Sequence, residues 1–209
     1  ESTVAAAVPY GSASEVDSAP TSPATYGSIA TDPFNTGRVV AAITVAGAST
    51  PGIRIGTTSG STITWGTEIV VNSETNEYPP VICFDPNNEN QIILAYMGTY
   101  TSREYVGYGR FYNRAGTISG NTITLGTATE LGGGAGALAW SAEYLTSLNF
   151  NTSGTFVISG RANPAGGYVF VRAGTISGTT ITLGTAVSLF SDYVTIGNAV
   201  ADPSAPTKF

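Results

Sequence analysis

The chain repeats one sequence pattern three times, and this repeat constrains the fold more than any other feature. The first glycines of the copies, Gly56, Gly116 and Gly174, are 60 and 58 residues apart. A regular period of this length indicates a tandem array of similar structural units. The three copies read GTTSGSTITWGTEIVV at 56–71, GTISGNTITLGTATEL at 116–131 and GTISGTTITLGTAVSL at 174–189.

A degraded copy extends the repeat toward the start of the chain. The run VPYGSASEV at 8–16 is similar to ITLGTATEL at 123–131, which aligns Gly11 with Gly126. Residues 1–16 are therefore predicted to contain the last strand of a preceding unit.

A second marker, an aspartate followed by proline, recurs at the equivalent place in successive units. The aspartates are Asp32, Asp85 and Asp202, and Asn151 stands at the equivalent place in the third unit. An aspartate before proline commonly accepts hydrogen bonds from its own turn. We therefore expect these aspartates to be structural. Calcium needs six or more converging oxygens, so we expect no metal here.

The second unit shows the strand pattern most clearly. Four runs suited to strands are separated by turn-forming residues, at 79–84, 91–97, 107–118 and 122–127. The run at 91–97 is apolar on both faces, which predicts a strand buried on both sides. The segment Ser119-Gly120-Asn121 is typical of a tight hairpin turn. Each unit is thus predicted to hold four antiparallel strands.

Tandem units of four antiparallel strands indicate an all-β fold, a β-propeller built of four-stranded blades. Three blades rarely close a ring, because known propellers carry about four to eight. We therefore expect a section of a larger propeller, or several copies that close together. The predicted parts are the last strand of a preceding blade at 1–16, complete blades at 25–72, 79–131 and 142–189, and the opening strand of a further blade at 193–209.

Composition excludes several classes of function. Histidine is absent, which removes histidine triads and histidine-bearing metal sites. Eight basic residues against fourteen acidic ones give a net charge of −6, which disfavours nucleic-acid binding. No apolar stretch approaches the roughly 20 residues that span a bilayer, so membrane insertion is not expected. The single cysteine, Cys83, lies in an apolar run and is interpreted as a small buried hydrophobe.

Catalysis has no recognisable constellation in this sequence. A glycosidase needs two carboxylates facing each other across the scissile bond. Glutamates are present, but none lies in a pattern that pairs it with a second acid. The chain is therefore predicted not to be an enzyme, and no cofactor is implied.

Three arginines occupy equivalent positions, two residues before the Gly-Thr of each repeat. They are Arg54, Arg114 and Arg172. A ligand site rarely needs one copy of a residue in each blade. We therefore predict a structural role, with hydrogen bonds to a turn aspartate or to a backbone carbonyl within or between blades.

The second unit departs from its neighbours by a segment rich in tyrosine and arginine. Both residue types are frequent in interaction hot spots, and exposed loops on rigid scaffolds commonly carry function. The alternative is that these aromatic residues simply pack against the next blade. The candidate ligand-binding residues are Tyr100, Arg103, Tyr105, Tyr108 and Arg110.

The run AGTISGNTITLGTATEL, with the opening FDPNNENQIILAY before it, resembles propeller repeats of bacteriophage tail-fibre and other virion proteins. The resemblance covers 25–209 and, more weakly, the first 16 residues. It implies a non-enzymatic, extracellular, oligomeric part that is structural or binds a receptor. Sialidase-like propellers are a looser resemblance: SGSTITWGT lacks their aspartate and fixed glycine, and Trp65 is interpreted as a core residue between blades.

Three functions remain open at this point. The first is a structural or adhesion component of a virion or phage tail fibre that recognises a host glycan or protein. The second is a secreted or cell-surface lectin-like propeller of a bacterium, and the third is a fragment of a sialidase-like glycoside hydrolase. Expected partners are other copies, other virion or surface proteins, and the remainder of a longer parent chain.

Overall fold

The computed structural model describes residues 27–45, 50–73, 80–99, 109–131, 141–151, 153–163 and 168–190. All regular structure in these residues is β-strand, arranged in three antiparallel sheets. The predicted all-β class is therefore confirmed. The predicted partial blades at 1–16 and 193–209 lie outside the described residues.

Sheet 1 belongs to the first repeat unit and has the strand order β1-β2-β3-β4, with β5 also paired to β3. β4 pairs with the end of β3 and β5 with its beginning, so the two short strands act as one interrupted outer strand. The strands are β1 (Ser28–Thr31), β2 (Arg38–Val45), β3 (Thr50–Ser59), β4 (Thr62–Trp65) and β5 (Ile69–Val70).

Sheet 2 repeats this arrangement in the second unit. β8 again pairs with β7 on one side and with both β9 and β10 on the other. Each of the four strands predicted for this unit overlaps an observed strand. The strands are β6 (Val81–Phe84), β7 (Gln91–Thr99), β8 (Gly109–Ser119), β9 (Thr122–Leu125) and β10 (Thr129–Glu130).

Sheet 3 has the same topology, with β13 paired to β12, β14 and β15. Its first strand is longer and pairs with β12 through two register shifts, near Tyr144 and Ser147. The strands are β11 (Ser141–Phe150), β12 (Thr155–Asn163), β13 (Tyr168–Ser177), β14 (Thr180–Leu183) and β15 (Val187–Phe190).

The hairpin that joins the third and fourth strands of each sheet turns on a glycine. Gly60, Gly120 and Gly178 have φ angles of 59°, 57° and 58°. Residues with a Cβ rarely adopt this left-handed conformation, so glycine is the residue that the turn requires. This is why the Ser-Gly step recurs in all three repeats.

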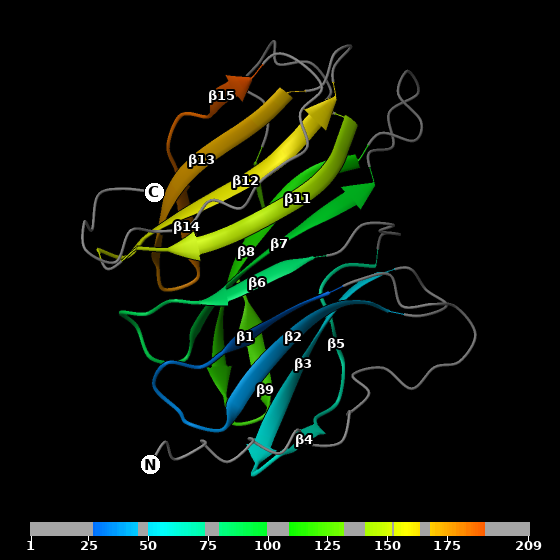
Figure 1. The fold of residues 1–209 in the computed structure, drawn as a ribbon, viewed down its shortest axis with the longest axis vertical. Helices are drawn as coiled ribbons and strands as arrows, with labels where there is room; N and C mark the ends of the chain where they lie inside the picture. The colour runs from blue at the N-terminus through cyan, green and yellow to red at the C-terminus, as the bar shows by residue number, and fades with distance from the viewer. Residues whose placement is uncertain are drawn as a thin grey trace, which may run out of the picture.

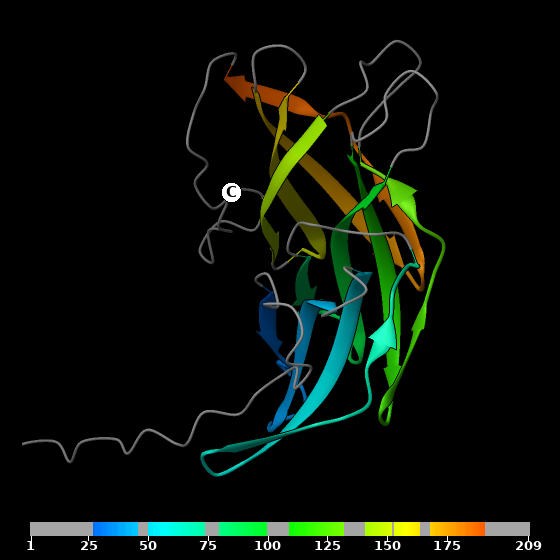
Figure 2. The same ribbon diagram turned by 90° about the vertical axis from the view of Figure 1, so that its right-hand side faces the viewer.

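The sheets stack in chain order, with sheet 2 between sheet 1 and sheet 3 (Figures 1 and 2). Alternate residues of β7 face opposite sides: Ile92 and Leu94 pack in the cluster shared with sheet 1, and Ile93 and Ala95 in the cluster shared with sheet 3. β7 is thus buried on both sides, as predicted. We call the side of each sheet toward the preceding unit its back face, and the other side its front face.

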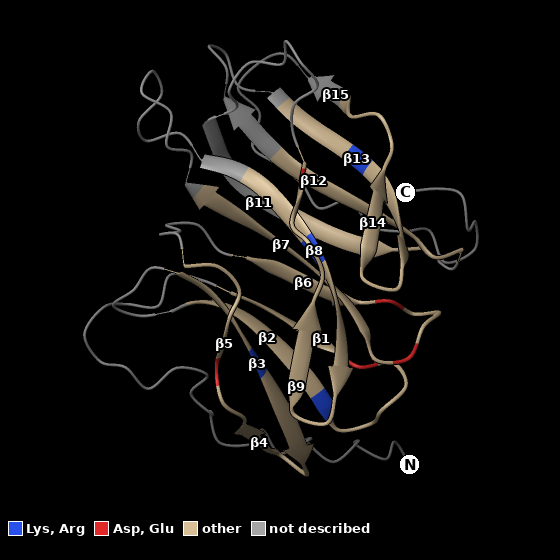
Figure 3. Ribbon diagram, turned by 180° about the vertical axis from the view of Figure 1, so that it is seen from behind, with Lys and Arg blue, Asp and Glu red and all other residues tan. Residues whose placement is uncertain are grey.

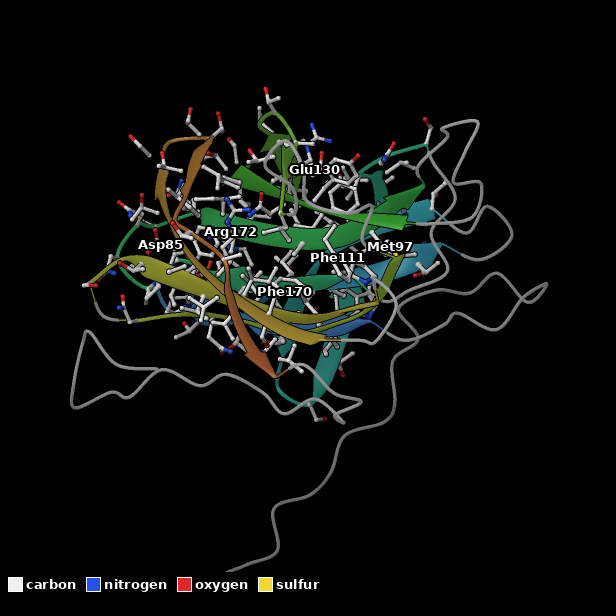
Figure 4. The ribbon with its side chains drawn as sticks, turned by 90° about the horizontal axis from the view of Figure 1, so that it is seen from above. Asp85, Met97, Phe111, Glu130, Phe170 and Arg172 are labelled. Atoms are coloured by element: carbon white, nitrogen blue, oxygen red, sulfur yellow. The ribbon has the colours of Figure 1, made fainter. Side chains whose placement is uncertain are left out.

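The two interfaces between sheets are apolar. Phe111 of sheet 2 and Phe170 of sheet 3 lie between their sheets, with ring centroids 5.7 Å apart (Figure 4). The three sheets do not close into a ring, so the fold is established here as stacked antiparallel sheets. Trp65 lies on the back face of sheet 1, against which no sheet packs among the described residues. Its predicted position between two blades stays a prediction, because the strand predicted to precede sheet 1 lies outside the described residues.

Candidate functional site

The connection between the first and second strand of each sheet is a capped turn. The Asp32 carboxylate accepts hydrogen bonds from the backbone amides of Phe34 at 2.8 Å and Asn35 at 3.1 Å. Asp85 accepts one from the amide of Asn87 at 2.8 Å. These are the self-capping bonds that the Asp-Pro pattern predicts.

In the third unit Asn151 replaces the aspartate and keeps the turn. Its side-chain oxygen accepts hydrogen bonds from the amides of Ser153 at 3.1 Å and Thr155 at 2.9 Å. An amide oxygen therefore provides the same cap without a charge. Asp202 lies outside the described residues.

Asp32 differs from the other caps because a cation also binds it. Arg38 donates through Nε to the carboxylate and forms an ion pair with it. Burial by itself raises the pKa of Asp32, but the hydrogen bonds from Phe34, Asn35 and Arg38 favour the charged form and bring the pKa below its ordinary value of 3.8. Arg38 also donates to the side chain of Asn90, which links the turns of sheets 1 and 2.

The repeated arginines connect consecutive sheets. Arg114 donates from Nε to the carbonyl of Gly126 and from Nη1 to the carbonyl of Val71, both at 2.7 Å. Gly126 lies in the same unit as Arg114, whereas Val71 follows the outer strand β5 of sheet 1. One guanidinium therefore holds its own outer strand and the outer strand of the preceding sheet.

Arg172 makes the same two links one unit later. Its Nε donates to the carbonyl of Gly184 at 2.7 Å, and its Nη1 donates to the carbonyl of Leu131 in sheet 2. Partial burial lowers the pKa of Arg172 by desolvation. The acceptors are carbonyls and not turn aspartates, which decides between the two partners that sequence reasoning left open.

Arg54 occupies the equivalent place in sheet 1. Its guanidinium lies 3.6 Å from the carboxylate of Glu68 in the same unit. The later units carry alanine where unit 1 has Glu68, at Ala128 and Ala186. The first arginine of the series is therefore placed beside an acid that the other two do not have.

The inner edges of the three sheets line one shared cavity. β6 lies beside β1 on one side and beside β11 on the other. Residues of these strands, together with Pro33 and Pro86, surround a cavity of about 660 Å³. None of its described lining residues is charged, and charged residues are sparse on the described strands as a whole (Figure 3). Such a lining suits an uncharged ligand.

A serine link crosses the inner edge and was missed by sequence reasoning. The Ser28 hydroxyl of β1 accepts a hydrogen bond from the backbone amide of Ile82 in β6 at 2.8 Å. An edge strand leaves such amides unpaired within its own sheet. The only sequence signal was that serine recurs at the equivalent position of the third unit, Ser147.

Cys83 lies in the lining of this cavity and is half-buried. Desolvation raises the pKa of its thiol, and the charge of Asp85 raises it further. The thiol is therefore protonated at neutral pH and is a poor nucleophile, in keeping with its interpretation as a small hydrophobe. The described residues contain no group of three or more side chains suited to hold a metal ion.

Most of the predicted ligand-binding residues lie outside the described residues: Tyr100, Arg103, Tyr105 and Tyr108. Arg110 lies on β8 opposite Gly98. In the sequence, residues 100–108 follow β7 and precede β8. The equivalent connections in sheets 1 and 3, residues 46–49 and 164–167, have four residues each where this one has nine.

Asn113 is a second residue that sequence reasoning missed. It is fully buried in β8, and neither its amide nitrogen nor its oxygen has a hydrogen-bond partner among the described residues. It lies on the front face of sheet 2, where sheets 1 and 3 carry Ile53 and Val171. A polar residue at an otherwise apolar repeat position was the signal available in the sequence.

Within the described residues, no helix has the length and apolar character needed to cross a membrane. No known protein-family model matches this chain, and no curated protein matches it in sequence.

Proposed function

We propose that this chain is a non-enzymatic scaffold, a section of a β-propeller that serves as a structural and adhesion component of a virion or phage tail fibre. The observation that carries the proposal is the repeated link between sheets. Arg114 and Arg172 each bind the outer strand of the preceding sheet, and the inner strands of all three sheets lie around one cavity. Successive blades around an axis have this arrangement of inner and outer edges.

The proposed adhesion site is the long β7–β8 connection. β2, β7 and β12 run toward the same side of the molecule, so these three strands end on that side (Figure 1). The connection of sheet 2 is five residues longer than its equivalents and carries Tyr100, Arg103 and Tyr105. A longer loop of tyrosine and arginine on a rigid scaffold supports a role in binding a host glycan or protein.

A non-enzymatic role is supported by the chemistry of the cavity. Its described lining has no carboxylate pair, and its one thiol, Cys83, stays protonated at neutral pH. Those lining residues include no carboxylate or imidazole that could act as a general acid or base, or that could activate a lining serine hydroxyl as a nucleophile. The proposed site of action is extracellular, on the surface of a particle that meets its host.

The test is binding of the full chain to an array of bacterial lipopolysaccharides and capsular polysaccharides, with 4-nitrophenyl glycosides as probes for hydrolysis. We expect retention of at least one polysaccharide and no release of nitrophenol above the rate in buffer. The double variant Tyr100→Ala with Arg103→Ala should abolish retention, while Ser102→Ala in the same connection should not. Turnover of any glycoside contradicts the proposal and favours the hydrolase hypothesis.

A further inference from the structure

The inner edge of sheet 1 directs backbone polar groups into the shared cavity. In an antiparallel pair, residues that bond the partner strand alternate with residues whose N–H and C=O point the other way. The amide of Asp32 bonds the carbonyl of Arg38 across the β1–β2 pair, so Ala30 also faces β2. The amides and carbonyls of Ile29 and Thr31 therefore point away from β2, and both residues line the cavity.

The other two sheets repeat this edge at equivalent residues. The amide of Asp85 bonds the carbonyl of Gln91, and the amide of Asn151 bonds the carbonyl of Thr155. The same alternation then directs the backbone groups of every second residue of β6 and β11 away from the second strand of their sheets. The cavity-lining residues with this orientation are Ile82, Phe84, Leu148 and Phe150.

Ser28 shows that a hydroxyl is a suitable partner for these edges. Its oxygen accepts the hydrogen bond of the Ile82 amide at 2.8 Å. The described lining also includes the uncharged polar side chains of Ser147 and Asn149 and the exposed apolar side chain of Ile29. The cavity therefore offers hydrogen-bond donors, acceptors and apolar surface, and its described lining carries no charge.

These properties narrow the class of ligand. A charged ligand would lose its hydration without meeting a counter-charge in the described lining. A purely aliphatic ligand would leave the strand edges without hydrogen-bond partners. A peptide strand pairs with one edge, whereas the polar groups here come from three strands arranged around the cavity. Hydroxyls on a compact ring donate and accept in several directions, while the C–H faces of the ring are apolar.

We propose that this cavity binds a neutral oligosaccharide, with the edges of β1, β6 and β11 as its hydrogen-bond partners. The cavity volume of about 660 Å³ lies within the range of about 300–1,000 Å³ that is typical of small-ligand sites. Ile29 and Thr31 are exposed, so a ligand can reach the cavity past β1. This is a second binding site, and it does not depend on the adhesion role proposed for the β7–β8 connection.

The test is titration of the isotope-labelled full chain with maltotriose, cellotriose, mannotriose and N-acetyllactosamine, followed by two-dimensional NMR. We expect at least one of these neutral sugars to shift the amide resonances of Ile29, Phe84 and Leu148, with a Kd below ~1 mM. The Val70 amide is the internal reference, because it points away from β3 and lies outside the cavity lining.

A matched pair of proline variants tests the edge itself. Ile29 and Val70 are 57% and 54% exposed, and the amide of each points away from its partner strand. Proline at such an edge position removes the amide without breaking a ladder bond. Ile29→Pro should weaken sugar binding about fivefold, whereas Val70→Pro should leave the affinity unchanged. Thermal unfolding checks that both variants fold, and Thr31→Pro provides a second test if Ile29→Pro does not.

Several outcomes overturn the inference: no shift with any of the sugars, shifts that leave the inner-edge amides unmoved, or equal losses of affinity in the cavity and Val70 variants. Shifts at the edges with a capped tetra-alanine peptide and with none of the sugars also overturn it, and assign these edges to strand pairing. Sugar-dependent shifts at the inner edges and retention of polysaccharide are separate readouts, so failure of this site is distinguished from failure of the proposed adhesion function.

Discussion

The inner strands of sheets 1 and 2 carry the same residue at the same position, yet their environments differ. Ile29 and Ile82 both follow the first residue of a four-residue strand and share the pairing register with the second strand. Ile82 is buried because sheet 1 lies against its back face, whereas no described sheet lies against the back face of sheet 1. At this position of the inner strand, burial therefore depends on whether a described sheet lies against the strand and not on the local sequence.

The same comparison explains why the links between sheets matter. Within each sheet, backbone hydrogen bonds hold neighbouring strands together without help from side chains. Between sheets, the described contacts are apolar packing, the links of Arg114 and Arg172, and a few side-chain bonds near the edges. Substitutions inside a sheet therefore change how the strands of that sheet pair, whereas substitutions at these links change how one sheet is held against the next.

The sharpest test of the comparison makes one substitution at both positions. We expect Ile82→Ala to lower the free energy of unfolding by about 2–5 kcal/mol, since it leaves a cavity between sheets 1 and 2. Ile29→Ala should change it by less than about 0.5 kcal/mol, because the side chain is already exposed. Urea unfolding of the monomer, followed by tryptophan fluorescence, measures both. Equal losses at the two positions would show that an unrecognised neighbour covers Ile29.

The arginine link should have the next largest effect. Arg114→Ala leaves the carbonyls of Val71 and Gly126 without their donor, and we expect a loss of about 2 kcal/mol, typical of hydrogen bonds to a charged group. Arg114→Lys keeps the charge but lacks the planar guanidinium that donates to both carbonyls at once. Its loss of stability should therefore lie between those of the original chain and the alanine variant. Calorimetric unfolding provides the measurement. A lysine variant as stable as the original would show that charge alone, and not the two directed bonds, holds the sheets together.

At Asn113 we expect a substitution to raise the free energy of unfolding and not to lower it. Its buried amide lacks a partner among the described residues and lies where the other sheets carry apolar side chains. We expect Asn113→Val to stabilise the chain by about 1 kcal/mol, because it removes the desolvation penalty of an unsatisfied polar group. The reverse change, Val171→Asn, lies on the half-buried front face of sheet 3 and should cost less than that. Destabilisation by Asn113→Val would show that the amide has an unseen partner.

Much of the fold could be predicted from the repeat alone. The strands of the second unit, their antiparallel order, the glycine turns and the side-chain caps all depend on residues a few positions apart. Local patterns determine such features because turn conformation and alternation of side chains are local properties. The interruption of the outer strand between β4 and β5 was not predicted. Residues 66–68, where the strand is interrupted, contain no proline and belong to the repeated Gly-Thr pattern, so nothing in the sequence indicated a break.

The links between sheets could be predicted only in part. The period singled out Arg114 and Arg172, but their acceptors Val71 and Leu131 lie 43 and 41 residues away and are backbone atoms. Backbone acceptors leave no mark in the sequence, since every residue has a carbonyl. The Ser28–Ile82 link and the burial of Asn113 were missed for a different reason, because both depend on which sheet lies next to which. The adhesion hypothesis for the β7–β8 connection stays a prediction.

Acid should loosen the capped turn of sheet 1 before that of sheet 3. Asp32 has a folded-state pKa below 3.8, so its charged form contributes stability above that pH, and the contribution is lost as the pH falls through the lower folded value. Asn151 caps the equivalent turn with a neutral amide and has no proton to gain in this range. Hydrogen exchange should therefore accelerate at the amides of Phe34 and Asn35 on acidification, relative to those of Ser153 and Thr155.

Asp32→Asn makes the two turns chemically alike and should remove the difference in their acid response. The substitution also loses the ion pair with Arg38, and because the Asp32 side chain is fully buried and that of Arg38 is only 16% exposed, the cost at neutral pH should exceed the ~1 kcal/mol of a surface pair. Asn35→Ala removes one side-chain donor to the carboxylate, which should move the folded pKa back toward 3.8 and weaken the acid response without abolishing it. If the two turns of the original chain open in parallel as the pH falls, the carboxylate cap is not what holds the first turn, and packing of the neighbouring turn through Asn90 must account for it.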